Sequence, residues 1–233
     1  MLSNTTSIIK ASLLLLSTVA FRVTVTPPNG PPTTIPPRPT FKNILTSEVR
    51  EWVLRLVLFY FLSPLGGKLF YLASFNEIIY ILNNDTSLNS LFLIGALLSI
   101  TGGIIRSLCY QALAGTFTFE VVPAGARSQS PSTKPRLITH GPYSIVRHPS
   151  YTGCMMNFVG TVMVHLVDGT WIRMQSQPAI VALVGAWVII MGFTSLLLCT
   201  RVDEEDEMMM EQFGEEWVTW QRRVRYKLVP GVY

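Results

Sequence analysis

Long apolar stretches separated by polar links make up most of this chain. Five stretches are apolar over enough residues to cross a bilayer as helices, which takes about 17–25 residues each. They run roughly over 8–26, 52–74, 91–114, 151–167 and 179–199. Pro64, Gly66 and Gly67 predict that the second stretch breaks or ends early. The pattern therefore predicts an all-α integral membrane protein with about five transmembrane helices.

The links differ in composition, and this difference divides the chain. Residues 27–40 contain seven prolines, which is typical of an extended linker. Residues 201–233 contain five basic and eight acidic residues, and we interpret them as an amphipathic helical tail. We therefore expect N-terminal transmembrane helices over 1–114, including the proline-rich linker. The second region, 115–233, should consist of a polar loop, a transmembrane hairpin and C-terminal helices.

Basic residues gather on one side of the predicted membrane. The segments 27–51, 115–150 and 201–233 hold twelve Lys and Arg residues, whereas 1–7, 75–90 and 168–178 hold one. The positive-inside rule places the first set in the cytosol. Two glycosylation sequons, which begin at Asn4 and Asn84, fall on the opposite side and agree with this orientation.

The composition disfavours a soluble protein and several kinds of site. Charged residues make up 14% of the chain, against about 25% in soluble domains, and the mean hydropathy is +0.38. The net charge of +4 comes without a basic stripe spaced by aromatic residues, so we expect no nucleic-acid partner. The three cysteines lie apart in apolar stretches, and the three histidines lack ligand spacing to a carboxylate. We therefore predict no metal site.

The first of two notable segments on the predicted cytosolic side covers residues 141–153. It reads GPYSIVRHPSYTG and leads directly into the fourth apolar stretch. Pro149 suits the first turn of a helix, and the N–H groups of such a turn favour an anion such as a carboxylate. Alternatively, the basic residues of this segment anchor the chain at the membrane surface, and its tyrosines belong to an aromatic belt.

The second segment, 201–207, reads RVDEEDE and directly follows the fifth apolar stretch. Arg201 and Glu205 are four residues apart and so share one face of a helix. Alternatively, they form an ordinary ion pair on a solvated face, which contributes about 0.3–0.5 kcal/mol. Five consecutive acids exceed what one contact needs, so we expect most of them to be solvated.

These segments resemble the isoprenylcysteine carboxyl methyltransferase family. The shared features are Gly-Pro-Tyr-x-x-x-Arg-His-Pro-x-Tyr-x-Gly over 141–153, Arg-x-x-x-Glu over 201–205 and Phe-Gly-Glu-Glu-Trp over 213–217. The resemblance covers about 135–233, and it implies that 115–233 is the catalytic methyltransferase region. It implies S-adenosyl-L-methionine as the cofactor and the carboxylate of a prenylated cysteine as the acceptor, in CaaX-processed proteins such as small GTPases. It also implies a multi-pass protein of the endoplasmic reticulum membrane whose active site faces the cytosol.

The resemblance implies roles for particular residues as well. Arg201 would be the catalytic residue that faces the substrate carboxylate. The cofactor contacts would come from Pro135, Arg136, Leu137, Ile138, Tyr143, His148, Pro149, Ser150, Tyr151 and Glu205. Asp206 stands where the family has a second glutamate, and Arg225 stands where it often has a proline.

The chemistry of such a reaction suits a membrane protein. An ionised carboxylate needs no general base to attack a sulfonium methyl group, so the enzyme has mainly to orient the reactants and exclude water. Withdrawing a farnesyl-sized tail into water would cost on the order of 10 kcal/mol, which a site at the membrane avoids. Arg106 lies within the third apolar stretch and would be costly against lipid, so we expect it to face the bundle interior.

Three alternatives stay open at the level of sequence. They are a phospholipid N-methyltransferase, a sterol-type reductase that uses a nicotinamide cofactor, and a non-catalytic membrane scaffold. An amine acceptor must lose a proton and would prefer a carboxylate partner, so Arg201 favours a carboxylate acceptor. A scaffold would leave the cluster of Gly, Pro, His and Tyr residues over 141–153 unexplained.

Overall fold

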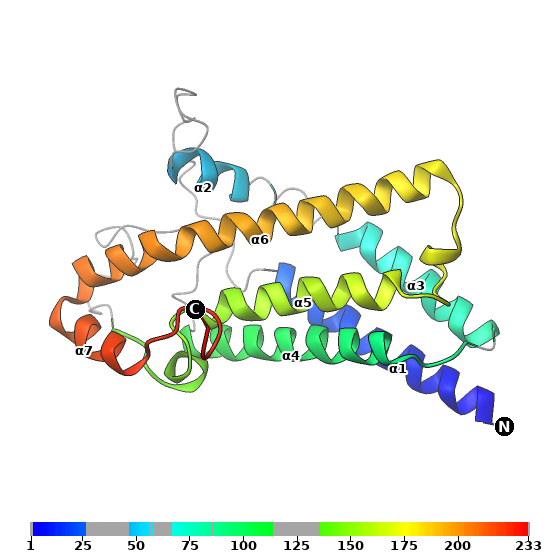
Figure 1. Ribbon diagram of the computed structural model, residues 1–233, viewed down its shortest axis with the longest axis horizontal. Helices are drawn as coiled ribbons and strands as arrows, with labels where there is room; N and C mark the ends of the chain where they lie inside the picture. The colour runs from blue at the N-terminus through cyan, green and yellow to red at the C-terminus, as the bar shows by residue number, and fades with distance from the viewer. Residues whose placement is uncertain are drawn as a thin grey trace.

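Helices make up all the regular structure in the described part of the chain, which confirms the predicted all-α fold. The computed structural model describes residues 2–26, 47–55, 57, 67–84, 86–113 and 136–232. The α-helices are α1 (Leu2–Val25), α2 (Ser47–Arg55), α3 (Gly67–Asn83), α4 (Ser90–Leu113), α5 (Pro149–Leu166), α6 (Pro178–Phe213) and α7 (Glu215–Arg223) (Figure 1). Two short 3-10 helices, η3 (Gly141–Ser144) and η4 (Ile172–Met174), precede α5 and α6.

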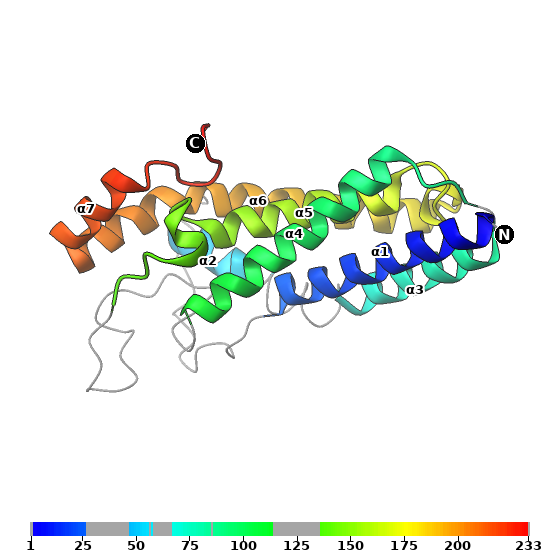
Figure 2. The same cartoon turned by 90° about the horizontal axis from the view of Figure 1, so that it is seen from below.

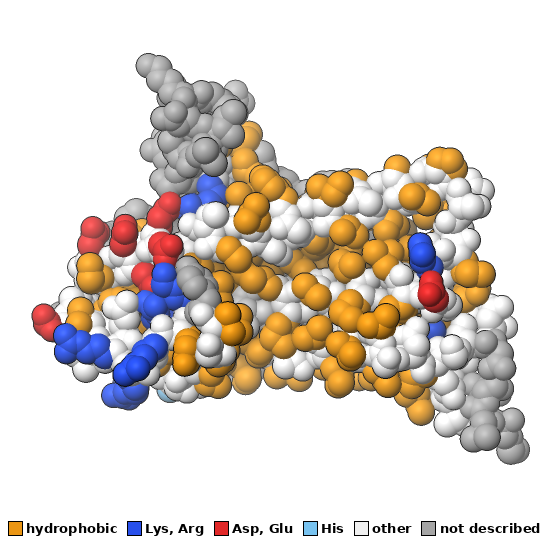
Figure 3. Space-filling model, viewed as in Figure 1, with side chains coloured by type: hydrophobic (Ala, Val, Ile, Leu, Met, Phe, Trp, Pro, Cys, Tyr) orange, Lys and Arg blue, Asp and Glu red, His pale blue; other side chains and the backbone are white. Residues whose placement is uncertain are grey.

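The surface and the helix lengths are those of a multi-pass membrane protein. Among the described helices, Thr5–Val25 of α1, all of α4 and the apolar part of α6 are long and apolar enough to cross a membrane. Apolar side chains cover the middle of the molecule, and charged side chains gather at its two ends (Figure 3). The end that carries α7 and the last turns of α6 holds most of these charges. Segments 141–148 and 201–228 therefore lie at the same end, as Figure 2 also shows.

The second predicted span needs correction. α2 ends at Arg55, and α3 begins at Gly67 and continues to Asn83, so residues 75–83 are helical rather than part of a link. The acidic residue in this part, Glu77, is 0% exposed. Its carboxylate accepts hydrogen bonds from the backbone N–H groups of Trp171 (2.8 and 2.9 Å) and Ile172 (3.4 Å), which offset the cost of burying it. The proline-rich linker 27–40 lies outside the described residues.

Among the described helices, α4 and α5 make the most extensive contact with each other. A Cβ atom added at Gly160 would lie 2.3 Å from the backbone N of Ser99, and one added at Gly102 would lie 2.5 Å from the backbone N of Asn157. Small residues at such contacts let membrane helices approach each other. The amide of Asn157 donates to the carbonyl oxygen of Ser99 at 2.9 Å across the same interface. This pair fixes where α5 begins, and therefore where the 141–153 segment lies.

Arg106 confirms the expectation that its side chain faces inward. It is 2% exposed and donates hydrogen bonds to the hydroxyl and the carbonyl oxygen of Ser150. Its guanidinium also lies 5.0 Å from the ring centroid of Tyr110, a cation–π distance. A cation in the third apolar stretch thus ties α4 to the first turn of α5.

α6 packs against the rest of the protein much less than α1 and α4 do. Only 11% of its most apolar stretch is buried inside the protein, against 44% for α1 and 39% for α4. One contact that holds it is the ring of Trp187, which stacks on Phe70 of α3 with centroids 5.7 Å apart. At about 1.5 Å per residue, its 36 residues extend well beyond a hydrocarbon core of about 30 Å. The polar last turns, which include residues 201–207, therefore project out of the membrane.

Candidate active site

The C-terminal segment pairs with the loop that precedes α5. The backbone N–H of Arg147 donates to the carbonyl oxygen of Tyr226, and that of His148 to Lys227, both at 2.9 Å. The hydroxyl of Thr152 donates to the carbonyl oxygen of Leu228 at 2.7 Å. These bonds hold the end of the chain against residues 147–152. The C-terminal segment also contacts the 201–207 segment, because Lys227 forms an ion pair with Asp203. It therefore holds the 141–153 and 201–207 segments together.

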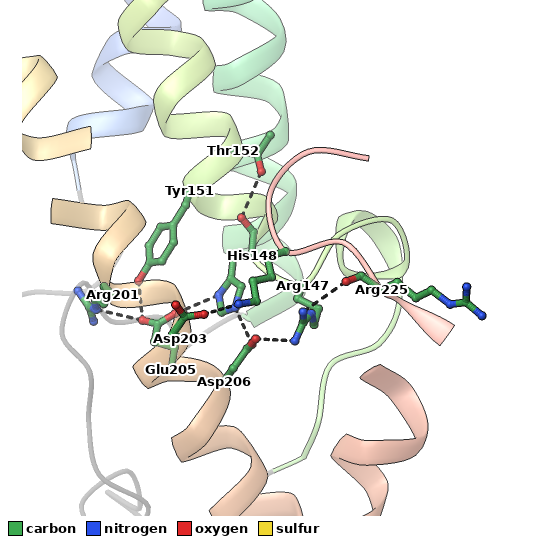
Figure 4. Close-up of polar contacts among 10 residues, drawn as sticks. Arg147, His148, Tyr151, Thr152, Arg201, Asp203, Glu205, Asp206 and Arg225 are labelled. Carbon is green, nitrogen blue, oxygen red and sulfur yellow. Dashed lines mark hydrogen bonds and ion pairs between the residues drawn. The ribbon is translucent and has the colours of Figure 1, made fainter. Parts of the chain in front are cut away.

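Glu205 lies at the centre of a cluster of polar side chains (Figure 4). Its Oε1 atom accepts a hydrogen bond from the hydroxyl of Tyr151 at 2.5 Å and lies 3.1 Å from Nε of Arg201. Its Oε2 atom lies 3.2 Å from Nδ1 of His148. The Glu205 side chain is 22% exposed, whereas those of Arg201 and His148 are 2% and 6% exposed. A buried set of donors therefore holds a carboxylate that a ligand can still reach.

The rings of His148 and Tyr151 lie parallel beside this carboxylate. Their centroids are 5.8 Å apart, with 8° between the ring planes. The two residues lie on one side because His148 is the N-cap of α5 and Tyr151 belongs to its first turn. Pro149, at the first position of the helix, has no N–H group to leave without a partner, as the sequence predicted.

Asp206 and Arg147 belong to the same cluster, and no role was assigned to them from the sequence. Nη1 of Arg147 lies 2.5 Å from Oδ2 of Asp206, and Nε2 of His148 lies 2.8 Å from its Oδ1. A second nitrogen of Arg147 donates to the carbonyl oxygen of Arg225 at 3.3 Å. Arg147 is itself the arginine of the 141–153 motif, and Asp206 directly follows Glu205 along the chain. These positions are the signal that could have found them.

His148 carries a proton at neutral pH. Burial by itself would lower the pKa of this ring, but its hydrogen bonds to Asp206 and Glu205 outweigh burial and raise the pKa to about 9. A charged imidazole donates from both nitrogens, so it can satisfy both carboxylates at once. The cluster thus alternates positive and negative groups.

Four of the five acids in the run 203–207 have basic partners, so the expectation that most of them would be only solvated is wrong. Asp203 forms an ion pair with Lys227, and Glu204 forms one with Arg50 of α2. Glu205 and Asp206 have the partners described above. The basic partners come from α2, the loop before α5 and the C-terminal segment, so spacing along the helix could not reveal them.

The other residues expected to contact the cofactor are dispersed around this cluster. Ser150 is buried and turned toward Arg106. Leu137 packs with Trp217 and Trp220 in a small hydrophobic core under α7, and Tyr143 packs against the same core. Arg136 is exposed, Ile138 is half-buried, and Pro135 lies outside the described residues. The structure therefore joins His148, Tyr151, Arg201 and Glu205 directly, and it places Leu137 and Tyr143 beside the tail helix instead.

Parts of this chain are similar to known proteins of two kinds. The Delta(14)-sterol reductase of Methylotuvimicrobium alcaliphilum is 31% identical over 97 residues, which is 42% of this chain. That match spans only 19% of the reductase. No solved structure gives a significant match. A family described as phospholipid methyltransferase matches residues 91–216, which run from α4 into α7 and include the whole Glu205 cluster but not the C-terminal segment that bonds to residues 147–152. Because this match takes in more than half of the chain, the protein belongs to the phospholipid methyltransferase family of membrane methyltransferases.

Proposed function

We propose that this protein methylates the carboxylate of a prenylated C-terminal cysteine with S-adenosyl-L-methionine, at the cytosolic face of the endoplasmic reticulum membrane. The observation that carries the proposal is the position of Arg201. Its guanidinium is almost fully buried at the point where α6 leaves the apolar region, and it contacts Glu205 at 3.1 Å. A buried positive charge next to the Glu205 cluster suits an acceptor group that carries a negative charge. The acceptor proteins would be CaaX-processed proteins such as small GTPases.

The cluster suits the charges of the cofactor. S-adenosyl-L-methionine carries a sulfonium and an ammonium group, and carboxylates and aromatic faces are the groups that hold cations. Glu205 supplies a reachable carboxylate and Tyr151 an aromatic ring beside it, whereas the charged ring of His148 holds Glu205 in position. When bound, the cofactor supplies an electrophilic methyl group. Members of this family generally use this cofactor, and the residues present fit it.

Arg201 would orient the acceptor. A guanidinium can hold a carboxylate through two parallel N–H bonds, which limits the directions from which an oxygen atom can approach. The carboxylate is already ionised near neutral pH, so no residue has to remove a proton from it. Tight pairing also stabilises the ground state, so Arg201 contributes to the rate mainly through orientation. Its bond to Glu205 would link the acceptor site to the cofactor site.

The outward-facing surface of α6 suits a lipid-modified acceptor. Phe193 and Leu196, in the turns before Arg201, are 48% and 59% exposed. A prenyl chain can therefore stay in the hydrocarbon region while the attached carboxylate reaches the guanidinium. Keeping the chain there avoids a transfer cost of about 0.8 kcal/mol for each CH₂ group.

The test is methyl transfer by the purified protein in lipid nanodiscs with radiolabelled cofactor. We expect methylation of N-acetyl-S-farnesylcysteine and none of its methyl ester, in which the acceptor oxygen is blocked. Arg201→Gln should lower this activity at least about tenfold, as expected when a charged hydrogen bond is lost, and should leave S-adenosylhomocysteine affinity within a few-fold. Arg173→Gln, whose side chain is 62% exposed at the other end of the molecule, is the matched control. Full activity in Arg201→Gln would contradict the proposal.

Phospholipid N-methylation is the second candidate. The description of the matching family favours it, and the carboxylates of Glu205 and Asp206 could accept the proton that an amine must lose. Methylation of phosphatidylethanolamine but not of farnesylcysteine would select it. A nicotinamide-dependent reductase would instead show no rise in melting temperature with S-adenosylhomocysteine.

A further inference from the structure

Arg50 connects the N-terminal part of the chain to the turn of α6 that carries Arg201. Its Nη1 atom donates to Oε1 of Glu204 at 2.8 Å and to the carbonyl oxygen of Thr200 at 3.3 Å. Its Nη2 atom pairs with the other carboxylate oxygen of Glu204. The side chain of Arg50 is 10% exposed, and that of Glu204 is 43% exposed. This is a two-pronged contact between α2, which lies outside the family match, and the helix that bears the candidate active site.

Glu204 is placed to compete for Arg201. Residues three apart on a helix are neighbours, so Arg201 and Glu204 lie on the same side of α6. Arg201 instead directs its Nε atom to Glu205. Arg201 thus has two carboxylates as helix neighbours, three and four residues further on, and only Glu205 belongs to the cluster with His148 and Tyr151.

We propose that Arg50 is a positioning residue that prevents Glu204 from capturing Arg201. By engaging both oxygens of Glu204, Arg50 leaves Arg201 on Glu205 and oriented toward the acceptor. The acceptor part of this inference rests on the proposed function. Without Arg50, the carboxylate of Glu204 would seek the nearest cation, and Arg201 would turn away from Glu205.

This role differs from a simple anchor between two helices. If the Arg50–Glu204 pair only docked α2, removing either partner would have the same effect, and removing both would be no better. Positioning predicts an asymmetry instead. Loss of Arg50 harms the site because Glu204 becomes a competitor, whereas loss of the Glu204 charge removes the competitor.

The experiment compares wild type, Arg50→Gln, Glu204→Gln and the double variant in nanodiscs. For N-acetyl-S-farnesylcysteine we expect Arg50→Gln to raise KM about tenfold, as for loss of one charged contact. We expect Glu204→Gln to stay within about twofold of wild type and the double variant within about threefold. A double variant as impaired as Arg50→Gln, or a normal Arg50→Gln, would overturn the proposal. Should Arg50→Gln not fold, Arg50→Lys must show a smaller defect with the same rescue by Glu204→Gln.

A second measurement separates this proposal from the choice of acceptor. Capture of Arg201 would remove one of the contacts of Glu205, so Arg50→Gln should weaken S-adenosylhomocysteine binding about threefold, and Glu204→Gln should restore it. If wild type methylates no prenylcysteine, the proposed acceptor is wrong and this affinity alone decides the role of Arg50. Unchanged affinity in Arg50→Gln would then refute that role. A wild type without measurable affinity for the ligand would overturn both.

Discussion

The imidazole of His148 donates from Nε2 to Oδ1 of Asp206 at a distance of 2.8 Å. This bond joins the N-cap residue of α5 to the polar last turns of α6, 58 residues further along the chain. Nδ1 of the same ring lies 3.2 Å from Glu205. One protonated ring thus holds two consecutive acids in place, and the order of the cluster depends on that proton.

The raised pKa of His148 predicts a loss of stability in alkaline solution. The pKa of about 9 in the folded protein lies above the value of about 6.5 expected in the unfolded chain. The contribution is therefore fully present below about pH 6.5 and is lost as the pH rises through about 9. We expect the melting temperature and the affinity for S-adenosylhomocysteine to fall between about pH 7.5 and 9.5. Differential scanning fluorimetry and calorimetric titration across this range measure both.

His148→Gln provides the control for this pH dependence. The variant keeps a hydrogen-bonding side chain but cannot titrate, so its curves should be flatter over the same range. The groups that surround the ring, which are Glu205, Asp206, Arg147 and Tyr151, are the same in both proteins. Parallel curves for the two proteins would show that His148 is not the titrating group.

Tyr151→Phe should weaken cofactor binding without unfolding the protein. The substitution removes only the hydroxyl that donates to Glu205 at 2.5 Å and keeps the ring beside His148. A hydrogen bond to a charged group contributes about 1.5–3 kcal/mol, so we expect at least about a tenfold rise in the Kd of S-adenosylhomocysteine. Tyr226→Phe, at a residue that is 41% exposed, is the matched control and should bind normally. Equal affinity in the two variants would argue against the position assigned to the cofactor.

Gly160→Ala should force α4 and α5 apart. The added Cβ atom would lie 2.3 Å from the backbone N of Ser99 and 2.4 Å from the carbonyl oxygen of Gly95. Backbone atoms of a helix can move only together with the rest of the helix, so the two helices must separate. We therefore expect a loss of about 1–3 kcal/mol in the free energy of unfolding, measured by denaturation in mixed micelles. Gly185→Ala on α6 meets no atom within 4 Å and should be neutral or stabilising, because alanine favours a helix by about 1 kcal/mol. The close approach assigned to α4 and α5 would be refuted by a stable Gly160→Ala.

Arg106→Met tests the buried cation between α4 and α5. Methionine is also a long unbranched side chain but cannot donate a hydrogen bond to Ser150, so the first turn of α5 loses this bond to α4. We expect the free energy of unfolding to fall by about 1–3 kcal/mol, and S-adenosylhomocysteine to bind more weakly because His148 and Tyr151 flank this turn. Ile104→Met changes a residue on the same helix that is 54% exposed and serves as the control. The two variants would behave alike if Arg106 had no such role.

Apolar length along the chain was enough to predict the helical membrane fold. A lipid environment requires long apolar helices, so their approximate positions follow from composition. The inward direction of Arg106 followed from the same argument, since a cation against lipid is costly. The segments 141–153 and 201–205 could also be singled out, because each combines residue types in a recognisable order next to an apolar stretch. The bounds of α3 were wrong because the apolar helix continues past residue 74 and contains an acid, Glu77, whose buried partners, the N–H groups of Trp171 and Ile172, only the tertiary structure shows.

Only the tertiary structure decided which charges meet. Asp203, Glu204 and Asp206 look alike in the sequence, yet they pair with Lys227, Arg50 and Arg147, which come from three different parts of the chain. Periodicity describes neighbours within one helix, and it carries no information on partners tens of residues away. The path of the C-terminal segment and the packing of α2 set those distances. An ion pair gains its strength only at short distance, so the composition of the site depended on how the helices pack.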